Sequence, residues 1–132
     1  MIDSLVSCII EAESAGKADA VSSVGAVGLM QIMPATWKEW APIAGVSEDT
    51  PMTDPDANKK IGTAYIKFLL KRYDDNIPLA LAAYNWGLGH IDHYYKVLGS
   101  GVSVDDLLPF VPNETKKYIT KIANKLKSAK AT

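Results

Sequence analysis

The sequence predicts a mainly α-helical fold, and three observations support this prediction. Apolar residues recur at helical spacing in several stretches, a proline or a capping residue stands where such stretches begin, and glycine follows where others end. No confident long strand is present, although residues 20–28 (AVSSVGAVG) have the composition of a small β-hairpin. A chain of 132 residues fits one domain with a single core, which we expect to span residues 1–132.

The first predicted helix covers residues 4–14, with Asp3 or Ser4 as its cap. Its apolar residues are Leu5, Val6, Ile9 and Ile10. Residues 14–28 are Ser, Ala or Gly at ten of fifteen positions, which indicates tight turns and close backbone approach. A second helix begins at Pro34 and includes Trp37 and Trp40.

The strongest helical pattern begins at Pro55, after a cap at Thr53 or Asp54. Its predicted apolar side consists of Ile61, Ala64, Tyr65, Phe68 and Leu69. Residues 76–87 predict a short buried helix ending at Gly87, and residues 90–99 predict another ending at Gly99. After a linker, the last helix begins at Asn113 or Thr115; its apolar residues are Ile119, Ile122 and Leu126.

The charge balance, the single cysteine and the apolar runs of the sequence limit which partners and covalent features the protein can have. Lys plus Arg is 14 and Asp plus Glu is 15, so net charge gives no case for nucleic acid. The single cysteine, Cys8, excludes an intramolecular disulfide and is expected to be a packing residue. No apolar run approaches the roughly 20 residues that span a bilayer, so we expect no stable membrane insertion. The N-terminus has Asp3 and no basic region, and therefore does not resemble a signal peptide.

Glu13 lies on the apolar side of the first predicted helix. Positions around the helix axis are counted at about 100° per residue, with Leu5 at zero. The apolar residues then centre at about 70°, Glu13 lies at about 80° and Glu11 lies at about 240°. Desolvation raises the pKa of a carboxyl group, and a glutamic acid protonated near neutral pH can donate a proton to a leaving group. The pattern alone also allows Glu13 to end the helix and turn to water, or to pair with a lysine.

Other side chains suited to carbohydrate follow Glu13. Gln31 has an amide that donates and accepts hydrogen bonds, and Met33 offers a pliable apolar surface. Tyr84, Asn85 and Trp86 can bond to a sugar and stack against it. Each of these residues alone also fits a core or turn position, but together they fit a sugar cleft better.

Five motifs occur in an order typical of one family. They are ES at 13–14, AVSSVGAVGLMQIMP at 20–34, DP at 54–55 followed by Asn58, AYNWG at 83–87 and PNETKKYI at 112–119. The chain resembles the soluble lytic transglycosylase (SLT) domain, glycoside hydrolase family 23, related in fold to goose-type lysozyme. The resemblance implies a single lysozyme-like domain over nearly the whole chain.

The resemblance also implies a site. Glu13 matches the family's catalytic glutamate, and the matching substrate-binding residues are Ser22, Gln31, Met33, Tyr84, Asn85 and Glu114. Trp86 departs from the family, which commonly has a small residue at that position. No metal or other cofactor is implied.

The family's chemistry cleaves the β-1,4 bond between N-acetylmuramic acid and N-acetylglucosamine in peptidoglycan. Glu13 would act as general acid and then as base, giving a 1,6-anhydro product without a second carboxylate. The implied partner is the glycan strand, and a monomer is expected. Without a signal peptide, an enzyme acting on the cell wall suits a phage lysin, a virion-associated enzyme or a secretion apparatus.

Two other functions remain open at this stage. A goose-type lysozyme would need a carboxylate to position water, for which Asp19, Glu39, Asp56 or Glu114 are candidates. A non-catalytic peptidoglycan-binding module is the alternative from a different class.

Three further patterns favour ordinary structural roles. DPDAN from Asp54 resembles a calcium loop, but lysine and tyrosine occupy the positions that need glycine and glutamate. His90 and His93 have no clear third ligand, so we expect surface residues. The last helix has six lysines, which favour a solvated face over an anion-binding surface: Lys116, Lys117, Lys121, Lys125, Lys127 and Lys130.

Overall fold

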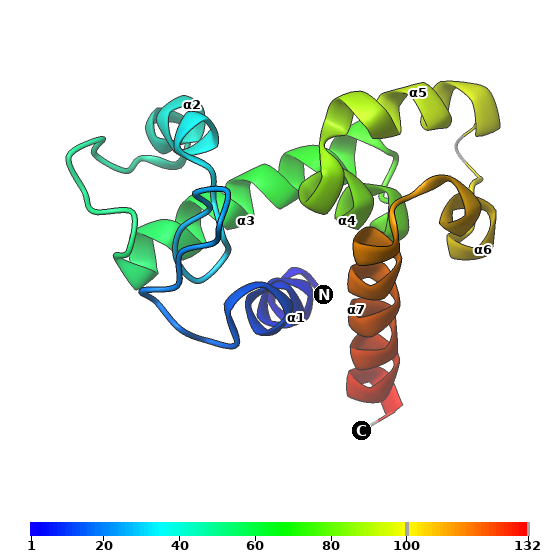
Figure 1. Cartoon of the computed structure of the whole chain (residues 1–132), viewed down its shortest axis with the longest axis horizontal. Helices are drawn as coiled ribbons and strands as arrows, with labels where there is room; N and C mark the ends of the chain where they lie inside the picture. Colours follow the sequence, from blue (N-terminus) through cyan, green and yellow to red (C-terminus); the bar gives the residue numbers. More distant parts are fainter. Residues whose placement is uncertain (100, 132) are drawn as a thin grey trace. The chain divides into compact units, whose positions relative to one another are not determined.

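The computed structural model describes the backbone of residues 1–99 and 101–131, and the side chains of residues 1–99 and 101–128 (Figure 1). This part of the chain forms helices joined by turns, and its β structure is limited to isolated bridges. The elements are α1 (Ile2–Ser14), α2 (Pro34–Ala44), α3 (Pro55–Arg72), α4 (Ile77–Trp86), α5 (Leu88–Leu98), α6 (Val104–Leu107), the 3₁₀ helix η1 (Leu108–Phe110) and α7 (Asn113–Ala131). The predicted mainly α class is confirmed. The chain divides into two compact units, Met1–Tyr65 and Ile66–Thr132.

Helix α1 buries Leu5, Val6 and Ile9, as its apolar spacing predicts. It begins at Ile2, so the predicted caps Asp3 and Ser4 are wrong, and the N-cap residue is Met1. Asp3 instead lies in the first turn, where a carboxylate interacts favourably with the helix dipole.

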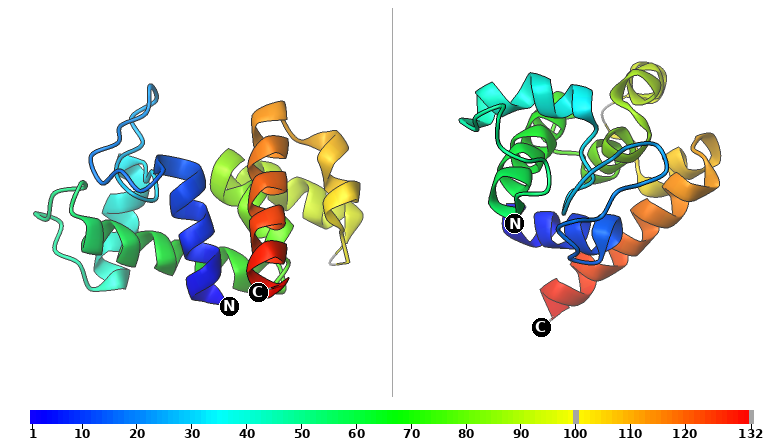
Figure 2. Two further views of the ribbon diagram at one scale, coloured as in Figure 1. Left: turned by 90° about the horizontal axis from the view of Figure 1, so that it is seen from below. Right: turned by 60° about the vertical axis from the view of Figure 1, so that its left-hand side comes forward.

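The segment between α1 and α2 doubles back on itself (Figure 2). Antiparallel bridges join Val21 to Val27 and Val27 to Ile32, which agrees with the small hairpin predicted there without forming a named strand. Helix α2 then starts at Pro34 and buries Trp37 and Trp40.

Helix α3 begins as predicted, because the Asp54 side chain accepts a hydrogen bond from the Ala57 backbone N–H at 2.9 Å. The predicted position of Phe68 on the buried side is wrong, since Phe68 is 37% exposed. Ile66 is fully buried instead. On an α-helix Ile66 lies about 160° from Phe68, so the buried stripe runs on the other side of Leu69 from the one predicted.

Within the second unit, α4 is central, as predicted, and both α5 and α7 pack against it (Figure 1). Its buried residues are Leu79, Ala80, Leu81, Ala82 and Ala83. Helix α7 buries the predicted Ile119, Ile122 and Leu126. Asn76 caps α4 by accepting from the Leu79 N–H at 3.1 Å.

The predicted linker before α7 contains a short helix that the sequence pattern does not reveal. A reciprocal capping box between Ser103 and Asp106 starts α6, and η1 follows directly. Leu107 is fully buried and attaches this segment to the unit.

An ion pair connects the end of α3 to α5. Arg72 donates two hydrogen bonds to Asp92, at 2.9 and 2.6 Å, and the Tyr73 hydroxyl donates to Asp92 at 2.9 Å. The hydrogen bonds from Arg72 hold the pKa of Asp92 below its usual value.

Candidate active site

Glu13 lies in the last turn of α1, where its side chain is half-buried, while Glu11 is exposed. The contrast between the two glutamates is therefore the predicted one, although Glu13 keeps part of its surface accessible. Its neighbour Ser14 is buried; the Ser14 hydroxyl donates to the Ile10 carbonyl at 3.1 Å and accepts from the Gly16 N–H at 3.2 Å. Ala15 then adopts a left-handed conformation with φ 52°, so the helix ends at Ser14, one residue after Glu13.

Ser22 organises the first part of the loop between α1 and α2. Its Oγ accepts hydrogen bonds from the backbone N–H groups of Val24, at 3.3 Å, and Ala26, at 3.0 Å. Both contacts use lone pairs of the oxygen. The hydroxyl hydrogen is not consumed by either contact and suits donation to a sugar oxygen.

Gln31 holds the same loop together. Its Nε2 donates to the carbonyls of Ala20, at 3.1 Å, and Gly28, at 3.0 Å. Both amide hydrogens are thus used within the loop, so the side-chain oxygen is the group left to meet a ligand. Gln31 has φ 51°, a left-handed conformation that costs free energy for a residue with a Cβ and is typical of positions near functional sites.

Met33 is the residue immediately before α2, and 41% of its surface is exposed. A flexible thioether side chain on the surface provides an adaptable apolar contact.

Asn58 fixes the loop to α3. This side chain is fully buried; it accepts from the Met30 N–H at 2.8 Å and donates to the carbonyls of Val27 and Met52, both at 2.9 Å. At Gly28, a Cβ atom would lie 2.2 Å from Asn58 Nδ2. The sequence identifies Asn58 as a motif residue but does not predict its structural role. Its three hydrogen-bond partners are backbone groups outside its own helix, and such contacts leave no periodic pattern in the sequence.

In the second unit, Tyr84 and Asn85 occupy the last turns of α4 and are half-buried. The Thr115 hydroxyl donates to Asn85 Oδ1 at 2.8 Å, and Thr115 is only 2% exposed. The predicted Glu114 precedes Thr115 in the first turn of α7 and is exposed. The structure thus brings Asn85 together with the start of α7, through a threonine that the sequence predicts only as a helix start.

Trp86 is the last residue of α4 and belongs to an aromatic cluster with His90 and Tyr94. Its ring stacks on His90 with centroids 4.0 Å apart and an angle of 4° between planes, and lies 6.2 Å from the Tyr94 ring. His90 and His93 are exposed, which confirms their predicted surface position. The Trp86 side chain, which is expected to depart from the family pattern, thus packs against residues of α5.

Acidic side chains can hold a metal ion or position a water molecule. In the described ranges 1–99 and 101–131, no three His, Cys, Asp or Glu side chains are grouped to hold a metal ion. The carboxylates that are candidates for positioning water, those of Asp19, Glu39, Asp56 and Glu114, are all exposed. No helix in the described part of the chain combines the length and apolar character needed to cross a membrane.

The sequence matches the transglycosylase SLT domain family over residues 2–100. It is 34% identical over 121 residues to soluble lytic murein transglycosylase of Escherichia coli K12, covering 86% of this chain and 18% of that protein. It is 42% identical over 83 residues to a transglycosylase of Enterobacteria phage PRD1, covering 63% of this chain and 28% of that protein.

A comparison with solved structures also relates this chain to lytic transglycosylases. An inactive glutamate-to-glutamine mutant of lytic transglycosylase Slt from Pseudomonas aeruginosa superposes with a TM-score of 0.79 at 34% identity, covering 92% of this chain and 20% of that one. In each comparison the match spans less than a third of the relative's own length. The lysozyme-like fold of this family is therefore the fold of this chain, and the chain belongs to the transglycosylase SLT domain family.

Proposed function

We propose that this chain is a peptidoglycan lytic transglycosylase, a lyase whose catalytic domain spans residues 1–132. It cleaves the β-1,4 bond between N-acetylmuramic acid and N-acetylglucosamine. Family membership and the names of the relatives support the reaction class. The observation that supports the mechanism best is the half-buried Glu13 on a helix end fixed by the buried Ser14.

Glu13 performs both proton transfers in the proposed mechanism. Its protonated carboxyl first donates a proton to the glycosidic oxygen, and the bond from that oxygen to C1 breaks. The substrate's N-acetyl group stabilises the positive centre at C1. The Glu13 carboxylate then takes the proton of the C6 hydroxyl, whose oxygen bonds to C1 and gives a 1,6-anhydro product. No water is consumed, so no second carboxylate is required.

The remaining side chains bind and orient the glycan. Ser22 donates its hydroxyl hydrogen and Gln31 accepts through its side-chain oxygen, because their other hydrogen-bonding groups are engaged in the loop. Met33 supplies an apolar surface. Tyr84, Asn85 and Glu114 contribute polar contacts, with Asn85 oriented by the Thr115 hydroxyl.

The similarity to a phage transglycosylase supports a phage-type lysin or a wall-penetrating enzyme as the biological role. In this proposal the protein acts as a monomer at the peptidoglycan layer. Its partner is the glycan strand, and neither nucleic acid nor a membrane is involved.

The test compares Glu13→Gln with Glu11→Gln, a matched change two residues away on the exposed side of α1. We expect Glu13→Gln to abolish clearing of a peptidoglycan suspension and Glu11→Gln to retain it, with unchanged circular dichroism in both. Activity retained by Glu13→Gln would exclude Glu13 as the acid. No activity in the wild-type protein would favour the non-catalytic binding module instead.

A further inference from the structure

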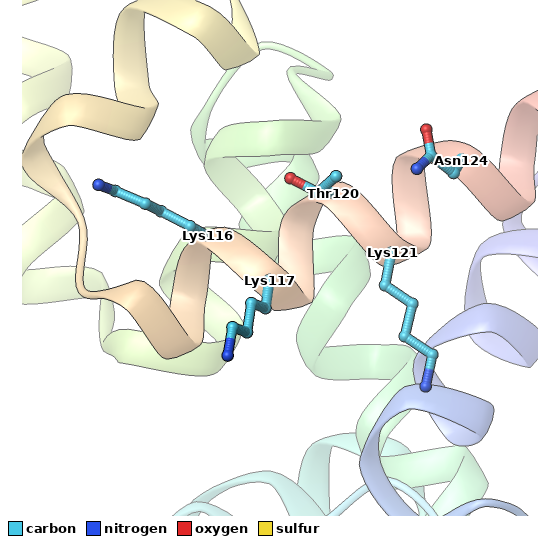
Figure 3. A pocket seen from close by; sticks show the side chains of 5 residues that line it. All are labelled: Lys116, Lys117, Thr120, Lys121 and Asn124. Atoms are coloured by element: carbon cyan, nitrogen blue, oxygen red, sulfur yellow. The ribbon is translucent and has the colours of Figure 1, made fainter.

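The face of α7 opposite its buried residues is basic and contains a pocket. With Thr115 at zero, the buried residues Ile119, Ile122 and Leu126 fall within about 40° of it on the helix. The pocket has a volume of about 350 Å³ and is lined by Lys116, Lys117, Thr120, Lys121 and Asn124 (Figure 3). These residues fall between about 100° and 240°, opposite the buried side.

Charge is concentrated on this helix. Residues 113–131 contain six of the fourteen basic residues and one acid, Glu114. Figure 3 shows Lys117 and Lys121 projecting to the same side of α7. Like charges four residues apart destabilise a helix, and Lys116, Lys117 and Lys121 have no ion-pair partner among the described side chains. An anionic ligand would remove this repulsion.

The pocket and the exposed polar groups favour a discrete ligand over a lipid bilayer. Thr120 and Asn124 add hydroxyl and amide groups to the lysines. The apolar part of the pocket surface belongs to the stems of these polar side chains, and its lining includes no aliphatic or aromatic residue that could insert into a membrane. From Lys116 to Asn124 the helix rises about 12 Å, which matches about four residues of extended peptide.

We propose that the pocket on α7 binds the carboxylates of the peptidoglycan stem peptide. This inference rests on the proposed function, because it takes peptidoglycan as the substrate. The glycan strand is uncharged where its lactyl group is amide-linked to the peptide, so the carboxylates complementary to these lysines belong to the stem peptide.

The test is calorimetric titration of the full chain with a free tetrapeptide of stem composition, and with the same peptide after its carboxyl groups are amidated. The test variant combines Lys116→Gln, Lys117→Gln and Lys121→Gln. The control combines Lys59→Gln, Lys60→Gln and Lys67→Gln on α3, which removes three exposed lysines and changes the net charge equally.

We expect the wild-type protein and the control to bind the free-acid peptide, and the test variant to bind it about tenfold more weakly. The amidated peptide should bind weakly to all three, and added salt should reduce the difference. Equal binding by the test variant and control, or equal binding of the two peptides, would overturn the inference. Binding of wild type to phosphatidylglycerol vesicles but not to the peptide would overturn it too, and would assign the face to a membrane.

This experiment is separable from the test of the reaction. Cleavage by wild type without lysine-dependent peptide binding would overturn the inference and leave the proposed function intact. Lysine-dependent peptide binding without cleavage would contradict the proposed reaction and support the α7 site.

Discussion

Asn58 on α3 accepts a hydrogen bond from the Met30 backbone N–H at 2.8 Å, across 28 residues of sequence. The same side chain donates to the carbonyls of Val27 and Met52. One buried amide therefore holds the loop that presents Ser22 and Gln31, two of the proposed substrate-binding residues of the first unit.

We predict that Asn58→Ala destabilises the protein by about 2–4 kcal/mol, because three backbone groups lose their hydrogen bonds to this buried side chain. Urea denaturation measures the loss, with the exposed Asn124→Ala as the control for removing an asparagine. A change below about 0.5 kcal/mol for Asn58→Ala would contradict the role assigned to this amide.

Gly28→Ala should be more disruptive than Gly25→Ala. Both glycines have positive φ, 86° and 91°, but a Cβ at Gly28 would lie 2.9 Å from the Met52 carbonyl oxygen, and nothing lies within 4 Å of one at Gly25. Both variants incur strain of about 1 kcal/mol, and Gly28→Ala adds an overpacking cost of about 1–3 kcal/mol. Thermal unfolding of the pair measures the difference; equal melting temperatures would argue against the tight packing at Gly28.

Thr115→Val keeps the shape of a buried side chain but removes the hydrogen bond to Asn85. We expect about a tenfold loss of lytic activity, since a free amide no longer points consistently at substrate, with about 1 kcal/mol lost in stability. Thr115→Ser retains the hydroxyl and should recover most activity. If both variants were equally impaired, packing at Thr115 would explain the effect better than orientation of Asn85.

The Arg72–Asp92 pair predicts a pH dependence of stability. Because the folded pKa of Asp92 is below its usual value, the pair contributes at pH values above about 3.9 and is lost as pH falls through the folded pKa. Both side chains are partly exposed, 40% for Arg72 and 34% for Asp92, so we expect Asp92→Asn to cost about 0.5–1 kcal/mol at pH 7.

Urea unfolding of wild type and Asp92→Asn across pH 2–7 measures this effect. The stability difference between them should narrow as pH falls below the usual aspartate value, since wild type loses the same charge by protonation. A difference that stayed constant down to pH 2 would contradict an electrostatic origin.

The sequence was sufficient for most helices, because apolar spacing coincides with explicit start and stop residues. Four such residues stand at helix boundaries in the structure: Pro34, Asp54, Asn76 and Gly99. The sequence pattern misplaces Phe68 because an aromatic residue at the edge of the apolar stripe fits the helical period almost as well as Ile66 does. It does not reveal helix α6 because four residues are too few to show a period.

The site was predictable as a set of residues but not as a set of contacts. Glu13 could be proposed from its angle on one helix, whereas the Thr115–Asn85 hydrogen bond joins residues 30 apart in sequence. Likewise, Gln31 was expected to offer donor and acceptor groups, and only the folded loop shows its donors used on Ala20 and Gly28.

The most direct measurement is mass spectrometry of soluble products from purified peptidoglycan digested by wild type and Glu13→Gln. The proposed mechanism predicts muropeptides ending in 1,6-anhydro-N-acetylmuramic acid from wild type and none from the variant. Products with ordinary reducing ends, each one water heavier, would contradict it and identify a lysozyme-type hydrolase that uses a water-positioning carboxylate.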